Sequence, residues 1–208
     1  GKGWVSVNGC CDSITSHRGA VMSINGRVRV PERFAIDWVR LDDENRLFNG
    51  DATKLESYAF YGDPIHAVAD GVVVNLYDEA DEQVPSEDAK GITTANIGGN
   101  MLVIEIGDGV VAFYAHLQRG RLKVKLGDRV KEGDVIGLLG NTGNSTAPHL
   151  HFHLMDGPSP LNANGLPFVL SEFSSAGTLP GSEKDNLFSG KTVKLDPRLS
   201  GKHVERLP

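Results

Sequence analysis

The chain has 208 residues, 39% of them hydrophobic and 23% charged, a composition typical of a globular protein with one main domain. The formal net charge of −6 argues against nucleic acid as a main partner, because binding phosphates requires basic surfaces. No apolar run reaches the ~18 residues of a membrane span, and no signal peptide is recognisable. The adjacent Cys10 and Cys11 close no long loop. We interpret them as part of an N-terminal turn, with a redox or metal site as the alternative.

Short β-type runs between turn signals dominate the sequence, which contains 25 glycines and 10 prolines. The first strand is predicted over residues 4–7. Residues 21–24 and 28–30 flank Asn25-Gly26, a strong signal for a two-residue hairpin turn. A further strand is predicted at 34–39, followed by a loop over 42–58.

The most regular pattern lies between residues 64 and 155. Strand-like runs are predicted, in chain order, at 64–69, 72–74, 101–106, 110–116, 122–126, around 130, at 135–139 and at 149–155, with a weaker candidate at 166–170. Helical periodicity is scarce. We therefore predict an all-β protein with an antiparallel sheet, closed or sandwiched.

The predicted organisation is a β domain over residues 1–177, with its core at 28–156, and a C-terminal extension over 178–208. The extension is polar and punctuated by proline and glycine, so we expect an irregular tail packed on the domain surface. Residues 78–99 form an insertion whose first half is acidic. A solvated loop is the expected reading, and a rim or lid contacting a cationic substrate is the alternative.

Three histidines alternate along the last strong strand: His149, His151 and His153. Because side chains two residues apart point to the same face of a strand, these imidazoles share one face. Asp37 lies in an apolar run, where a carboxylate is costly unless it is paired or bound to a cation. His116 ends the predicted strand at 110–116. A carboxylate with two imidazoles is a normal zinc ligand set, so these residues predict a zinc site.

Several motifs follow one another in a characteristic order. They are the turn Gly62-Asp63-Pro64-Ile65-His66-Ala67-Val68-Ala69-Asp70-Gly71, the segment Tyr114-Ala115-His116-Leu117, the spaced residues Gly127, Val130, Gly133, Ile136 and Gly137, and the segments Gly140-Asn141-Thr142-Gly143 and Pro148-His149-Leu150-His151-Phe152. With them, residues 62–155 resemble the lysostaphin/LytM-type zinc metallopeptidase family. The resemblance implies a β-sandwich built on a duplicated hybrid motif, and a protein exported to the cell envelope, periplasmic or secreted.

The resemblance also implies roles for individual residues. Asp37 and His151 match zinc ligands, and His149 and His116 match two histidines that assist catalysis. The family cleaves peptide bonds in peptidoglycan stems or cross-bridges. Bound zinc polarises the scissile carbonyl and activates water. His149 is then expected to act as general base, and His116 to hold water or stabilise the oxyanion.

The chain departs from the family at the first ligand motif. Arg33 stands four residues before Asp37, where the family has a histidine ligand. Arginine stays protonated and cannot bind a metal, and it could pair with Asp37 instead. Two histidines could replace the missing ligand. His17 would lie near Arg33 if the hairpin continued, whereas His153 would lie about 7 Å further along the strand than His151.

Three functions remain open at this stage. The first is a divergent zinc endopeptidase acting on cell-wall peptide, favoured by the retained His116, His149, His151 and Asp37. The second is an inactive binding or adaptor domain of the same fold, favoured by Arg33. The third is a carrier domain, disfavoured because residues 140–145 offer no lysine. Substrate sequence and oligomeric state are not readable from the chain.

Overall fold

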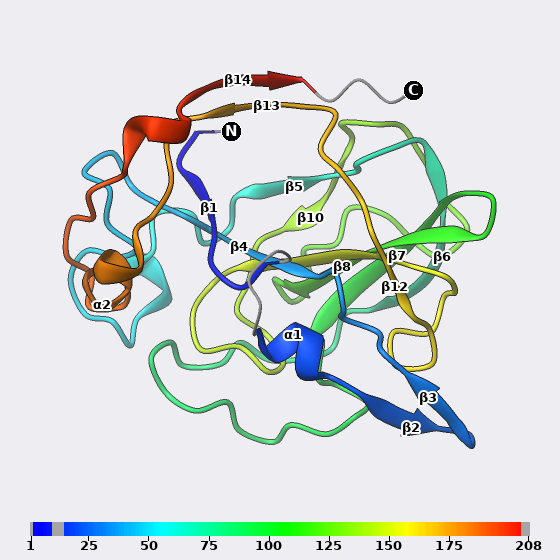
Figure 1. Cartoon of the computed structure of the whole chain (residues 1–208). Helices are drawn as coiled ribbons and strands as arrows, with labels where there is room; N and C mark the ends of the chain where they lie inside the picture. Colours follow the sequence, from blue (N-terminus) through cyan, green and yellow to red (C-terminus); the bar gives the residue numbers. More distant parts are fainter. Residues whose placement is uncertain (1, 10–14, 205–208) are drawn as a thin grey trace.

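The computed structural model describes residues 2–9 and 15–204, so Cys10 and Cys11 lie outside the described residues. Its centre is an eight-stranded antiparallel sheet (Figure 1). The strands along the sheet are β1 (Trp4–Ser6), β4 (Ile36–Arg40), β11 (Leu150–Met155), β8 (Val110–Leu117), β7 (Asn100–Gly107), β6 (Gly71–Tyr77) and β9 (Arg129–Val130), with β12 (Gly165–Leu166) paired to β11. The predicted all-β, antiparallel class is confirmed.

Three two-stranded sheets surround this centre. They pair β2 (Met22–Ile24) with β3 (Arg27–Arg29), β5 (Pro64–His66) with β10 (Val135–Leu138), and β13 (Glu172–Ser175) with β14 (Gly201–Val204). The predicted N-terminal hairpin is confirmed: Asn25 and Gly26 have φ values of 50° and 74°, as a tight turn with two left-handed residues requires. The helices are short, namely α1 (Ser16–Gly19), α2 (Lys184–Phe188) and the 3₁₀ turns Leu55–Ser57, Gly181–Glu183 and Pro197–Leu199.

Apolar side chains cover both faces of the central strands. Alternate residues of β8 enter two different clusters: Ala112 and Tyr114 pack in the larger one, and Phe113 and Ala115 in the smaller one. This explains why residues 110–117 read as a continuous apolar run, since a strand buried on both faces has no polar side. The smaller cluster lies on the face that carries the histidines.

Three strand predictions were wrong or too long, and of the one at 64–69 only residues 64–66 form a strand. Residues 122–126 form no strand, although Leu122 and Val124 pack against the core. Of the candidate at 166–170, only Leu166 belongs to a strand. Packing alone can account for apolar residues in an irregular segment, so periodicity over five residues was too weak a signal.

The C-terminal extension is more structured than an irregular tail. It contains α2, and it places Leu187 and Val193, both buried, in the larger core cluster. β14 pairs with β13, so hydrogen bonds join the segments before and after residue 177 (Figure 1). The division of the chain at 177 stays a prediction. Within the described residues, no helix is long and apolar enough to cross a membrane.

Candidate metal centre

Neighbouring strands place Asp37 directly opposite His151. The two residues are register partners between β4 and β11, so their side chains lie on the same face of the sheet. His151 Nδ1 lies 3.0 Å from Asp37 Oδ1. His149 lies two residues before His151, and its Nε2 is 3.6 Å from the same oxygen.

The N-terminal segment adds His17 to this pair. His17 lies on α1, a four-residue helix that begins where the Thr15 hydroxyl accepts a hydrogen bond from Arg18 N. Its Nε2 lies 3.3 Å from Asp37 Oδ2. His17, Asp37 and His151 each place one potential metal-ligand atom within 4.8 Å of the other two. We call these three residues the three-donor cluster, where donor means a metal-ligand atom.

His17 reaches this place by a different route from the one expected. The β2–β3 hairpin ends at the pair Met22↔Arg29 and does not continue to residue 17. Instead, α1 turns the chain back, and His17 Nδ1 lies 3.2 Å from the carbonyl oxygen of Ala35. The proximity to the first motif was anticipated, but the cross-strand register was wrong.

Arg33 takes no part in the cluster. Its side chain is exposed and its guanidinium lies over the ring of Phe34, 5.7 Å from the ring centroid. Among the described residues, no ion pair joins Arg33 to Asp37, whose carboxylate instead lies within 3.6 Å of ring nitrogens of His17, His149 and His151. The structure therefore does not form the Arg33–Asp37 pair that the sequence left open.

Backbone carbonyls fix the protonated nitrogen of three histidines. The Nδ1 atoms of His17, His116 and His149 lie 3.2, 2.7 and 2.8 Å from the carbonyl oxygens of Ala35, Thr142 and Ala147. A carbonyl oxygen only accepts, so each Nδ1–H must donate. In the neutral ring, each Nε2 then keeps its lone pair.

The three-donor cluster consequently has more lone pairs than protons. With neutral rings, His17 Nε2 faces Asp37 Oδ2 with no proton between them. The side-chain amide of Asn8 supplies donors to this oxygen at 3.0 Å, but it also lies 2.8 Å from Ser16 Oγ and 3.3 Å from His17 Nε2. A bound cation satisfies such a set, and one carboxylate with two imidazoles suits zinc.

The pKa shifts report the same demand for positive charge. Burial alone would raise the pKa of Asp37, but hydrogen bonds from His151 and His17 outweigh it and hold the pKa well below its usual range. Burial would lower the pKa of His17, but the hydrogen bond and charge of Asp37 raise it above its ordinary value. A proton on His17 is therefore favoured beside the carboxylate, and a bound cation would take the place of that proton.

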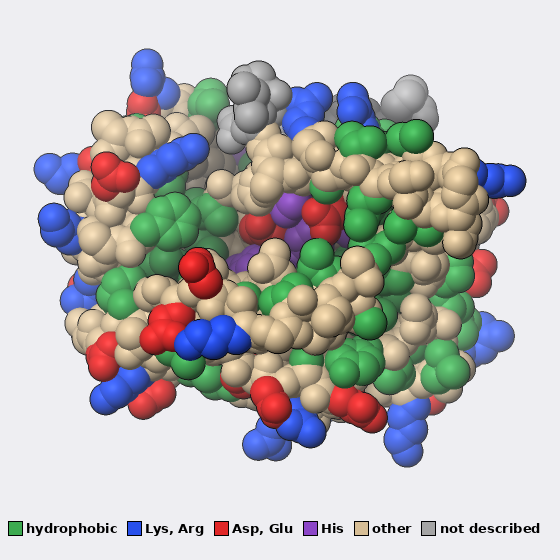
Figure 2. All heavy atoms as spheres, turned by 90° about the horizontal axis from the view of Figure 1, so that it is seen from below, with side chains coloured by type: hydrophobic (Ala, Val, Ile, Leu, Met, Phe, Trp, Pro, Cys, Tyr) green, Lys and Arg blue, Asp and Glu red, His purple; other side chains and the backbone are tan. Residues whose placement is uncertain are grey.

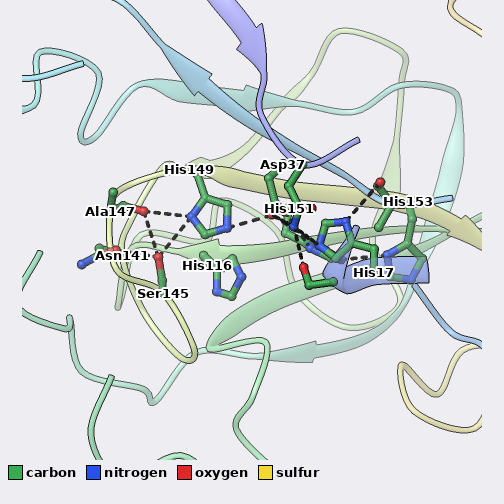
Figure 3. Close-up of polar contacts among 12 residues, drawn as sticks. His17, Asp37, His116, Asn141, Ser145, Ala147, His149, His151 and His153 are labelled. Atoms are coloured by element: carbon green, nitrogen blue, oxygen red, sulfur yellow. Dashed lines mark hydrogen bonds and ion pairs between the residues drawn. The ribbon is translucent and has the colours of Figure 1, made fainter. Parts of the chain in front are cut away.

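His116 and His149 form a second pair beside the cluster (Figure 3). Their ring centroids are 4.5 Å apart. Burial lowers the pKa of both rings, so both are neutral near pH 7. Ser145 Oγ lies 3.1 Å from His149 Nδ1 and 2.6 Å from Asn141 Oδ1, which steadies this ring.

The backbone of His116 is left-handed, with φ of 62°. This conformation is disfavoured for residues with a side chain, and it persists where the surroundings hold it. Here His116 N donates to Gly98 O at 2.9 Å, and its carbonyl accepts from Gly140 N at 3.1 Å. The kink directs the ring toward His149.

His153 lies on the other side of His151 (Figure 3). Its Nδ1 is 3.0 Å from His151 Nε2, and its ring packs on Phe113 with centroids 4.9 Å apart. It is not a member of the three-donor cluster. The alternative in which His153 replaces the missing ligand is thus less well placed than His17.

The cluster lies in a cavity of about 530 Å³. Figure 2 shows histidine and acidic side chains inside this hollow, between apolar side chains. The second half of the 78–99 insertion forms one wall, through Thr94, Ala95, Ile97, Gly98 and Gly99. The insertion is also hydrogen-bonded to the loop after β10, where Asn141 N donates to Glu82 Oε2 at 2.6 Å. It is therefore part of the site, and a purely solvated loop was the wrong expectation.

Sequence reasoning missed Asn8, Asn141 and Ser145. Asn8 and Ser145 were given no role, and Asn141 entered only as part of the segment Gly140-Asn141-Thr142-Gly143. No local pattern distinguishes such hydrogen-bonding residues from ordinary turn residues. The surface residue His66, with its Nδ1 2.8 Å from Gly133 O, lies outside the cavity.

Comparisons with known proteins show the family to which the chain is similar. A family model described as Peptidase family M23 matches residues 54–163, just over half of the chain. The match contains His116, His149 and His151, while His17 and Asp37 precede it. The glycyl-glycine endopeptidase ALE-1 of Staphylococcus capitis is 41% identical over 95 residues, which cover 45% of this chain and 22% of that protein.

Two further proteins extend the comparison. The peptidoglycan DD-endopeptidase ShyA of Vibrio cholerae is 32% identical over 139 residues, 67% of this chain and 27% of that protein. The chain thus spans about a quarter of the length of either curated relative. A catalytic-domain mutant of the prophage-encoded M23 protein EnpA from Enterococcus faecalis matches with a TM-score of 0.48 and 21% identity, covering 80% of this chain and 89% of that one.

Proposed function

Because the chain belongs to peptidase family M23, we propose that it is an active zinc metallopeptidase that hydrolyses peptide bonds of peptidoglycan. His17, Asp37 and His151 are its proposed protein ligands. The main support is the three-donor cluster, in which one carboxylate and two imidazoles bring their ligand atoms within 4.8 Å of one another. The names of the relatives, a glycyl-glycine endopeptidase and a DD-endopeptidase, support a peptide of the cell wall as substrate.

The residues around the cluster divide the remaining work. Zinc held there would supply Lewis acidity toward the scissile carbonyl and toward a water. His149 Nε2 keeps a lone pair and lies 3.6 Å from Asp37 Oδ1, so it is placed to accept a proton from that water. His116 Nδ1–H donates to Thr142 O, which leaves Nε2 able to accept. This favours the water-holding role of His116 over oxyanion stabilisation.

The cavity suits an uncharged or cationic peptide. Its lining contains the carboxylates of Asp37 and Glu32, and no lysine or arginine among the described residues. Peptidoglycan is found at the cell envelope, so we propose a periplasmic or secreted location.

Metal content and cleavage together test the proposal. Protein purified without added zinc is expected to hold about one zinc per chain by elemental mass spectrometry, and to release new amino termini from purified peptidoglycan. His149→Ala is expected to keep the zinc and lose cleavage, because His149 is not a proposed ligand. Absence of zinc after reconstitution would refute the proposal and favour the binding or adaptor domain, which Arg33 in the usual ligand position supports.

A further inference from the structure

His153 is a buried imidazole for which the proposed mechanism has no use. It is 1% exposed, and its ring packs on the Phe113 ring with centroids 4.9 Å apart. Its Nδ1 lies 3.0 Å from His151 Nε2. Its own Nε2 has no hydrogen-bond partner among the described residues.

When both rings are neutral, two arrangements of protons are consistent with the contacts from Asp37 to His151 and from His151 to His153. In the first, His151 Nδ1–H donates to Asp37, and His153 Nδ1–H donates to His151 Nε2. In the second, His151 Nε2–H donates to His153 Nδ1, and His151 Nδ1 keeps its lone pair toward Asp37. Only the second leaves His151 able to bind a metal through Nδ1, the atom 3.0 Å from Asp37 Oδ1.

We propose that His153 is a positioning residue for His151. Its Nδ1 accepts a hydrogen bond from His151 Nε2–H and so keeps His151 Nδ1 unprotonated for the metal; this inference rests on the proposed zinc site. Buried acceptors of this kind are commonly carboxylates, backbone carbonyls or water. In the described part of the chain, His153 is the only hydrogen-bond partner of His151 Nε2.

The arrangement has a cost that a residue serving only to fill space would avoid. In the metal-binding arrangement His153 Nε2–H is a buried donor without a partner, which is unfavourable. An apolar side chain would pack on Phe113 without this penalty. The hydrogen bond to His151 therefore accounts better than packing for an imidazole at this position.

Leucine and asparagine at position 153 separate the hydrogen bond from packing. Both branch at Cγ, but only asparagine places an oxygen acceptor near the position of Nδ1. His153→Leu is expected to weaken zinc affinity by about 10–100-fold, the usual effect of losing such a partner. His153→Asn is expected to stay within about threefold of the wild type.

The measurement is competition for zinc against a chromophoric chelator, with circular dichroism of each metal-free variant to establish folding. Phe113→Leu is the packing control, because the Phe113 ring contacts the rings of both His151 and His153 without a hydrogen bond to either. Long-range ¹H–¹⁵N NMR of the zinc-loaded wild type adds a direct readout, with the proton expected on His151 Nε2.

Each outcome has a defined meaning. Weak binding by the leucine variant alone supports the proposal. Equal affinities in all variants, or equal losses in the leucine, asparagine and Phe113 variants, overturn it while leaving the zinc site intact. Failure of the wild type to bind zinc overturns the proposed function, and the role of His153 with it.

Discussion

Replacing His17 with alanine removes one donor of the three-donor cluster and leaves Asp37 and His151. Structural zinc sites with four ligands bind with about 10–16 kcal/mol, or roughly 2.5–4 kcal/mol for each ligand. Since every 1.4 kcal/mol is a factor of about ten, zinc affinity should fall by roughly 10²–10³-fold. The Asp37 carboxylate would also lose the partner at 3.3 Å from Oδ2.

Chelator competition on the wild type, His17→Ala and His66→Ala measures this loss. His66 is the matched control, because it is an exposed histidine with a single carbonyl partner and lies outside the cavity. Its variant should bind zinc as the wild type does. If His17→Ala remains folded and binds zinc with unchanged affinity, His17 is no ligand, and another residue must replace the histidine that Arg33 displaces.

Three further results are expected. Leu187→Ala should lower the free energy of unfolding by about 2–5 kcal/mol in denaturant titration, since the side chain is 0% exposed, whereas Phe188→Ala, 58% exposed, should change it by at most about 0.5 kcal/mol. Glu32→Gln should raise KM for lysine-containing peptides by up to about fivefold at low salt, with no change for acetyl-lysine controls, because a partly exposed ion pair is weak. Arg33→His in the His17→Ala background should not restore zinc affinity, because side chain 33 points into solvent; restoration would show that this turn can still supply a ligand.

Local sequence signals were sufficient wherever one residue's neighbours along the chain decide its conformation. Asn25-Gly26 specified a tight hairpin turn, since both residues tolerate positive φ. The alternation along residues 149–155 predicted that His149, His151 and His153 share a face; β11 begins one residue after His149, and all three line the cavity. The pleat of a strand alone requires this.

The C-terminal extension could not be predicted in the same way. Its sequence has the composition of a surface tail, yet Leu187 and Val193 are buried in the larger core cluster. Whether an isolated apolar residue is buried depends on what the rest of the fold leaves uncovered. Composition does not show which part of the core surface the rest of the fold leaves uncovered.

The sequence by itself determined the β architecture, the shared face of the three histidines and the absence of a histidine at position 33. Only the tertiary structure decided which residue approaches Asp37 in its place. α1 carries His17 to Asp37 across twenty residues of sequence. The physical reason is that a metal site requires atoms to meet in space, and such long-range contacts are fixed by chain packing rather than by local pattern.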